Sequence, residues 1–137
     1  MNRLALLALA LLTACGGAAS NPEAARWAGH AKNVTITRDD WGIPHIKGKT
    51  DADAVFGMIY SQAEDDFNRV EMNFANVLGR MALVKGEAAV WEDLRMHLFV
   101  PEDSLKAWYA GADPKLKALM DAWADGLNYY LRTHPDV

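Results

Sequence analysis

The chain has 137 residues, of which 51% are hydrophobic and 23% are charged, and 14 Lys and Arg against 18 Asp and Glu give a formal net charge of −4. This length fits one ordinary domain, and the composition excludes the collagen-like, coiled-coil and low-complexity classes. The acidic balance, without a cluster of Lys and Arg in the sequence, argues against a nucleic-acid partner, because nucleic-acid binders carry a basic surface. The single cysteine, Cys15, excludes a disulfide or a multi-cysteine zinc site within these residues.

Residues 1–15 predict an export signal. A basic residue, Arg3, precedes the apolar run Leu4–Leu12, which is too short for a membrane-spanning helix of about 20 residues. The run Leu12-Thr13-Ala14-Cys15 resembles the bacterial lipobox, in which the cysteine becomes the lipid-bearing first residue of the mature protein. We therefore expect lipid attachment at Cys15 and a lipid-anchored location in the bacterial periplasm. The alternative is an ordinary signal peptide with a coincidental cysteine.

The segment after the signal is predicted to be a tether over residues 16–33. It is rich in small and polar residues, includes Pro22, and shows neither a sustained helical nor a strand period. Because no basic patch is visible in the sequence, the lipid alone is expected to hold the protein at the membrane.

A β-hairpin is predicted next. Residues Val34-Thr35-Ile36-Thr37 alternate strictly between apolar and polar, Asp39-Asp40-Trp41-Gly42 has the composition of a turn, and Ile43-Pro44-His45-Ile46 forms the returning strand. A two-stranded ribbon is marginal in water, so this one is expected to join a larger sheet.

The remainder predicts helices. A capping-box pattern at Thr50 and Asp53 begins a helix over about 51–84, bent near Glu64-Asp65-Asp66 and ended by Gly86. A short helix is expected over 89–99. The pair Asp113-Pro114 begins a third helix with a wide apolar stripe, which ends near residue 134.

No catalytic constellation and no metal motif are visible, so we assign no catalytic or metal-binding residue in this chain. The four histidines are isolated from one another, and the serines lack a nucleophile-elbow motif. The acidic trio 64–66 fits a cation site or an acid/base pair less well than a solvated face or an internal Arg partner. Four aromatic residues on helical periods are expected to pack in the core or at a domain interface rather than to form a ligand cage. These histidines, serines and aromatic residues are His30, His45, His97, His134, Ser20, Ser61, Ser104, Trp108, Trp123, Tyr129 and Tyr130.

Several motifs resemble the start of the penicillin acylase family of N-terminal-nucleophile hydrolases, over roughly Val34 to Asn128. The quoted motifs are Val34-Thr35-Ile36-Thr37-Arg38-Asp39, Trp41-Gly42-Ile43-Pro44-His45-Ile46, Asp53-Ala54-Val55-Phe56-Gly57-Met58-Ile59-Tyr60-Ser61-Gln62-Ala63-Glu64-Asp65, Met72, Leu78-Gly79-Arg80, Gly86, Asp93-Leu94-Arg95 and Ala124-Asp125-Gly126-Leu127-Asn128. One departure is Ala63-Glu64-Asp65-Asp66, where many members read Ala-Gln-Asp-Arg, and it weakens any transfer of acyl specificity.

The resemblance implies an α+β fold: an N-terminal hairpin and a mainly helical segment, as a fragment of a four-layer αββα hydrolase. Residues 34–137 would be the N-terminal portion of the α subunit, an incomplete domain. In that family the precursor cleaves itself, and a serine at the new N-terminus of the β subunit attacks the amide carbonyl with its own amine as base. That serine, and most ligands of the calcium that the full-length protein is expected to bind, would lie downstream of Val137.

Two functions are therefore carried forward. The first is an exported amidase, with its β subunit from the same precursor, acting on an N-acyl substrate such as a β-lactam or an acyl-homoserine lactone. The alternative is a small, membrane-tethered helical lipoprotein used for binding or scaffolding. The uncompleted hairpin and chain end favour the first.

Overall fold

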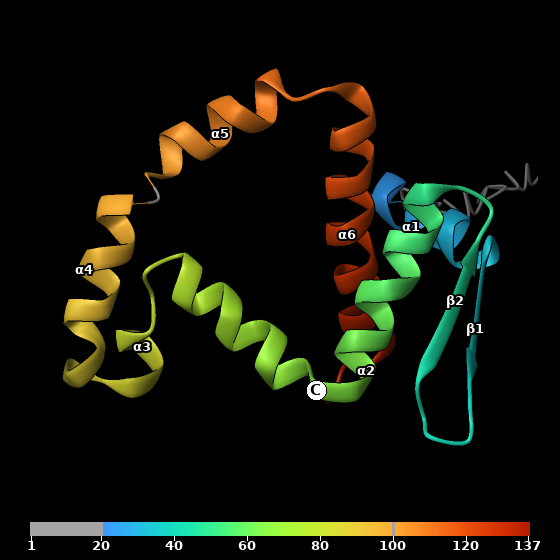
Figure 1. Ribbon diagram of the computed structural model, residues 1–137, viewed down its shortest axis with the longest axis horizontal. Coiled ribbons are helices and arrows are strands. Elements are labelled where there is room, and N and C mark those ends of the chain that lie inside the picture. The colour runs from blue at the N-terminus through green and yellow to red at the C-terminus, as the bar shows by residue number, and fades with distance from the viewer. Residues whose placement is uncertain (1–20, 100) are drawn as a thin grey trace, which may run out of the picture.

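The computed structural model describes residues 21–99 and 101–137. Figure 1 shows two parts: a packed body built from the hairpin and three helices, and an arm that leaves the body and returns to it. In chain order the elements are α1 (Pro22–Lys32), β1 (Val34–Arg38), β2 (Pro44–Gly48), α2 (Asp51–Val77), α3 (Ala82–Lys85), the 3₁₀ turn η1 (Glu87–Ala89), α4 (Val90–Phe99), α5 (Glu102–Gly111) and α6 (Pro114–Thr133). The predicted hairpin followed by a mainly helical segment is confirmed.

The hairpin lies against the first half of α2. Strands β1 and β2 pair antiparallel, with Ile36 opposite Ile46, and their half-buried side chains face the helix. Gly57 makes this contact possible, because a Cβ there would lie 2.6 Å from Val34 Cγ1 and 2.8 Å from Ile46 Cγ2. The alternation seen in the sequence thus places one face of the ribbon on α2 and leaves the other polar and exposed.

The core lies between α2 and α6. Phe56, Ile59 and Ala63 of α2 are buried against Ala122 and Tyr130 of α6. The two helices approach closely at Gly126, where a Cβ would lie 2.5 Å from both Ile59 Cγ2 and Phe56 O. Gly126 therefore determines the point along α6 at which the two helices cross.

The helix caps follow the sequence signals. Thr50 and Asp53 form the predicted capping box at the start of α2, and Asp113 caps α6 ahead of Pro114. The bend in α2 falls at Asp66, whose φ of −161° and ψ of 76° interrupt the helix. Gly86, predicted to end the long helix, ends the short helix α3 instead, with a φ of 76°.

Three sequence predictions need correction. Pro22–Lys32, placed in the tether, forms α1: Asn21 caps it, and its inner face at 24, 27, 28 and 31 is mostly alanine, which obscured the period. The helix predicted to reach 84 ends at Val77, because Gly79 has a φ of 62° and turns the chain before α3 begins. Helix α5 was not predicted. The predicted signal and lipid attachment at Cys15, with residues 16–20 of the tether, lie outside the described residues.

The arm consists of the second half of α2, then α3, η1, α4 and α5 (Figure 1). Asp93 of α4 reaches back to the start of α3: one carboxylate oxygen accepts from Met81 N at 2.7 Å and the other from Ala82 N at 2.8 Å. These donors are the free N–H groups at the start of α3, which the buried carboxylate satisfies. The contact joins α3 to α4 although the arm has little packing against the body.

The close crossing at Gly126 gives a stability prediction. The change Gly126→Ala should lower the free energy of unfolding by about 1–3 kcal/mol, because a methyl group has no room beside the Phe56 carbonyl. Gly29→Ala is the matched control: it lies in α1 with open space around it, so it should leave stability unchanged or raise it by up to about 1 kcal/mol. Urea unfolding of both variants measures the difference, and equal stability would contradict the packing argument.

Candidate functional site: two buried carboxylates beneath the N-terminal helix

Asp125 of α6 is a buried carboxylate that lies beneath α1. It is 2% exposed and accepts hydrogen bonds from Arg26 Nε at 2.5 Å, Arg26 Nη2 at 2.6 Å and Trp27 Nε1 at 2.8 Å. Burial opposes ionisation of this carboxyl, but the bonds from Arg26 and Trp27 outweigh it, so its pKa lies below the usual value. The bidentate pair holds α1 on α6.

Asp53 of α2 is a second buried carboxylate, 3% exposed, below the same helix. It completes the capping box by accepting from Thr50 N at 3.1 Å and from Thr50 Oγ1 at 2.8 Å, and it lies 2.8 Å from His30 Nδ1. Burial again opposes ionisation, and the bonds from His30 and Thr50 again lower the pKa of Asp53. One carboxylate therefore caps α2 and binds α1.

His30 lies between the two carboxylates. Its Nδ1 faces Asp53, its Nε2 is 3.9 Å from Asp125 Oδ2, and its ring stacks on Phe56 at 5.3 Å between centroids. Arg26 and His30, one turn apart on α1, thus contact both buried carboxylates. His30 looks isolated in the sequence, because its two partners, Asp53 and Asp125, stand 23 and 95 residues further along the chain.

This cluster is a clamp and not a reaction centre. Each carboxylate is held by donors of the chain itself, so neither is free to take a proton from a substrate. Ser61 is buried in α2 and donates to Gly57 O at 2.9 Å. Among residues 21–99 and 101–137, no group of three or more His, Cys, Asp or Glu side chains is placed to hold a metal ion.

The acidic trio has the internal Arg partner that the sequence favours. Arg38, at the end of β1, lies 3.2 Å from Glu64 Oε2 and 2.8 Å from Asp65 Oδ1. The third member, Asp66, stands at the break in α2 and caps the second half of the helix by accepting from Arg69 N at 3.0 Å. The trio therefore fastens the hairpin to the bend.

The remaining candidates are dispersed over the fold. Tyr129 and Tyr130 pack in an aromatic cluster with Tyr60 of α2, and Trp123 packs on Phe74 at 5.1 Å. Tyr130 is buried in the core, whereas Trp123 and Tyr129 are half-buried. Trp108 on α5 is exposed and does not belong to this core. His45 contacts Asp39 in the hairpin, while His97, His134 and Ser104 lie on α4, at the end of α6 and on α5. Ser20 lies outside the described residues.

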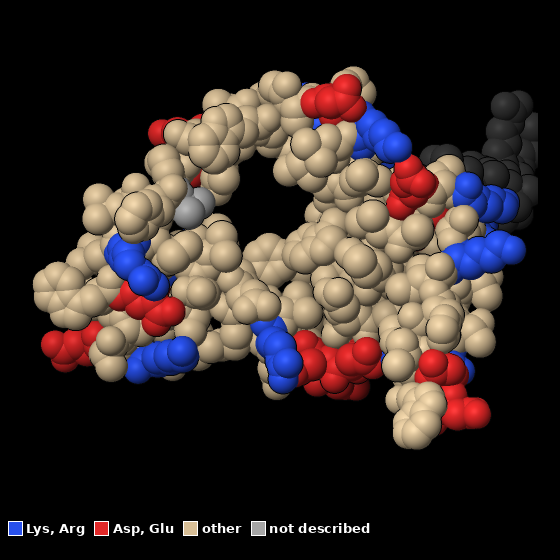
Figure 2. All heavy atoms as spheres, viewed as in Figure 1, with Lys and Arg blue, Asp and Glu red and all other residues tan. Residues whose placement is uncertain are grey.

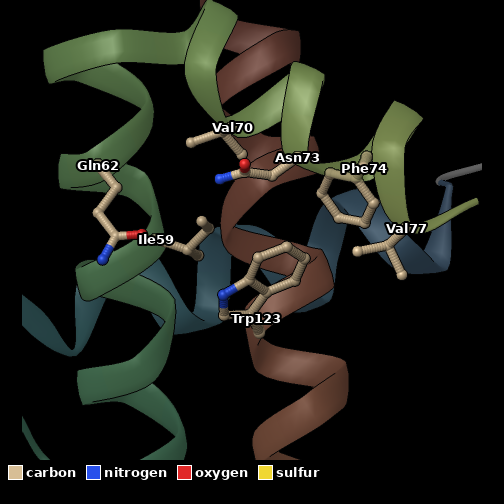
Figure 3. Close-up of a pocket in the computed structure, with 7 residues that line it drawn as sticks. All are labelled: Ile59, Gln62, Val70, Asn73, Phe74, Val77 and Trp123. Carbon is tan, nitrogen blue, oxygen red and sulfur yellow. The ribbon is translucent and has the colours of Figure 1, made fainter. Parts of the chain in front are cut away.

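A cavity of about 230 Å³ opens where the two halves of α2 diverge above α6 (Figure 3). Its lining residues are Ile59, Gln62, Val70, Asn73, Phe74, Val77 and Trp123. The lining includes no acid, base or nucleophile, so the cavity can bury an apolar group but cannot perform acid–base chemistry on it. Within the described part of the chain, no helix is both long and apolar enough to cross a membrane.

The clamp predicts how the stability of the protein depends on pH. Asp125→Asn should destabilise the protein by about 1–3 kcal/mol near pH 7, because the bonds from Arg26 lose their ionic partner. Since the folded-state pKa values of Asp53 and Asp125 are lowered, their stabilisation is present above the unfolded Asp value of about 3.9 and is lost as pH falls below it.

The stability of Asp125→Asn should therefore fall less steeply below about pH 4 than that of the unchanged protein. Thermal unfolding between pH 3 and pH 7 measures this slope. Asp136→Asn, a change of an exposed carboxylate near the chain end, is the control and should follow the unchanged protein. If stability fell equally steeply with pH in all three proteins, the proposed role of Asp125 in the clamp would be contradicted.

Comparison with known proteins identifies the family. The family model described as penicillin amidase matches residues 33–137. Acyl-homoserine lactone acylase QuiP of Pseudomonas putida is 32% identical over 79% of this chain, and penicillin acylase 2 proenzyme of a Pseudomonas species is 30% identical over 72%. Penicillin G acylase of Escherichia coli is 27% identical over 78% of this chain. The chain spans 13% of the length of each of these relatives.

A solved structure agrees with the sequence relationship. The thermostable penicillin G acylase of Alcaligenes faecalis matches 74% of this chain and 54% of its own with a TM-score of 0.69 at 24% identity. At this identity the match shows the fold alone: the hairpin and its helices are a fragment of the penicillin acylase structure. Since the family model also spans every element from β1 to α6, the chain belongs to the penicillin amidase family.

Proposed function

We propose that this chain is the N-terminal part of the α subunit of an exported amidase that cleaves the amide bond of an N-acyl substrate. The substrate would be of the β-lactam or acyl-homoserine lactone type, because the relatives are named as acylases of penicillin and of acyl-homoserine lactones. The observation that carries the proposal is the family match over 33–137, in a chain that spans 13% of its relatives.

The chemistry of amide hydrolysis supports a nucleophile downstream. The reaction needs a nucleophile, a base within hydrogen-bond reach and donors aimed at the developing oxyanion. In the described residues, the buried carboxylates are held by α1 and Ser61 is bonded to a backbone carbonyl. We therefore assign the catalytic serine to the β subunit. We propose calcium for the full-length protein alone, because no cluster in the described residues offers three metal ligands.

The arm supports a partner subunit from the same precursor. Trp91 and Leu98 of α4 are each 80% exposed, and Trp108 of α5 is 66% exposed. Figure 2 shows that uncharged side chains cover most of the arm on the face in view. Large apolar surfaces of this kind mark interaction sites in soluble proteins. The packed body and uncovered arm favour the amidase over the alternative of a complete, small binding lipoprotein.

The first prediction from this proposal concerns activity. The full-length precursor should split into two chains and release a carboxylic acid from an N-acyl amide, whereas residues 16–137 alone should hydrolyse none. The assay compares both proteins on a chromogenic phenylacetyl amide and on long-chain acyl-homoserine lactones, while electrophoresis follows the cleavage. Turnover by the short chain would contradict a downstream nucleophile. A precursor that stays intact and inactive on every substrate would favour the binding lipoprotein.

The second prediction concerns the anchor. The apolar run and Cys15 should direct export and lipid attachment, which places the protein at a membrane in the bacterial periplasm. Mass spectrometry of the mature N-terminus should find a lipid on Cys15, and Cys15→Ser should release soluble protein into the periplasmic fraction. An unmodified N-terminus at another residue would refute the lipoprotein and leave an ordinary signal peptide.

A further inference from the structure

We propose that α1 and the adjoining end of the hairpin form a membrane-facing surface, on which Lys32, Lys47 and Lys49 contact anionic lipid headgroups. These three lysines are called the basic face below. The proposal extends the proposed lipid anchor, on which it draws for the position of the bilayer, but the contacts that define the basic face are those of the described residues.

The fold brings the three lysines together from separate segments. Lys49 N donates to Asn33 O at 3.1 Å, which places Lys49 beside the residue that follows Lys32. Lys47 is paired with Thr35, which stands two residues after Asn33. Lys47 lies on the exposed face of β2, opposite the apolar face that packs on α2, and Lys49 follows directly after the strand.

Among the described residues, the lysines of the basic face differ from other cations in their ion pairing. In the part of the chain that the structure describes, the recorded ion pairs include none of the three lysines, and all three are exposed. By contrast, Arg26 is paired with Asp125, Arg38 with Glu64 and Asp65, and Lys115 with Asp51.

The sequence-based expectation of no basic patch is therefore corrected by the fold. Blue side chains project from the right-hand edge of Figure 2, at the level where Figure 1 shows α1 meeting the hairpin. Helix α1 has one carboxylate, Glu23, in its first turn, at the opposite end from Lys32. This chain, with a net charge of −4, thus presents a local surface of the opposite sign, which an anionic bilayer attracts.

The anchor would lie close to this surface. Six residues, 16–21, separate Cys15 from α1, and a chain of six residues spans at most about 20 Å. Helix α1 cannot swing away from the body, because Asp53 and Asp125 clamp it. The helix is about 16 Å long, so a bilayer that holds the lipid is within reach of the basic face at its far end.

The experiment measures the electrostatic contact without the lipid. The full-length precursor with Cys15→Ser is sedimented with vesicles of phosphatidylcholine alone or with 30% phosphatidylglycerol, at low and at high salt. We expect at least about threefold more binding to the anionic vesicles at low salt, and loss of that preference at high salt. Reversal of the three lysines (Lys32→Glu, Lys47→Glu, Lys49→Glu) should abolish the preference.

A charge-matched control separates the basic face from net charge. The triple change Lys85→Glu, Lys106→Glu and Arg132→Glu alters exposed residues on α3, α5 and α6 by the same total charge and should keep the preference for anionic vesicles. Equal binding to both vesicles, or equal loss in both triple variants, would overturn the proposal. Because the protein in this assay has no lipid, these results do not depend on whether Cys15 is lipidated.

A second measurement uses the unsubstituted precursor and needs no charge reversal. Amine-reactive labelling of vesicle-bound protein, followed by mass spectrometry, should show protection of Lys32, Lys47 and Lys49 relative to Lys85 and Lys106. Protection should appear with phosphatidylglycerol and disappear without vesicles. Uniform labelling of all five lysines on anionic vesicles would also overturn the proposal.

Discussion

The buried charge of Asp125 is the constraint on which the rest of the body depends. A carboxylate that is 2% exposed must be paired and hydrogen-bonded, and its donors come from Arg26 and Trp27 of α1. Helix α1 therefore belongs to the folded body, although the family match begins only at residue 33. The same docking brings His30 to Asp53, so the cap of α2 also becomes part of the clamp.

Asp125 binds α1, and its neighbour Gly126 lies where α6 packs on α2. Gly126 lets α6 approach the backbone of α2 at Phe56, and that approach places Asp125 under α1 on the adjacent side of the helix. Phe56 itself is covered by the stacked ring of His30. Two consecutive residues of α6 thus determine both how it crosses α2 and where α1 lies. A change at either position should disturb the other contact, because they share one short stretch of helix.

The sequence predicts what local chemistry determines. Alternation predicts the hairpin, the Thr50–Asp53 box and Asp113-Pro114 predict two helix starts, and the bend falls within the acidic trio. The clamp was missed, since Arg26 and Asp125 stand 99 residues apart and no local pattern joins them. Helix α1 was missed because alanines dilute its period, and the three lysines looked scattered because only the folded hairpin places Lys49 beside Asn33.

The body and the arm divide the roles that we propose for this chain. The body satisfies its own buried charges and apolar faces, and it carries the N-terminal helix on which the proposed anchor would act. Within the arm Asp93 joins α4 to α3, but large apolar side chains of α4 and α5 stay exposed. In a lipid-anchored amidase the clamp would therefore transmit the position of the bilayer to the body. The arm would receive the subunit that supplies the nucleophile, so this chain would orient the catalytic machinery rather than contain it.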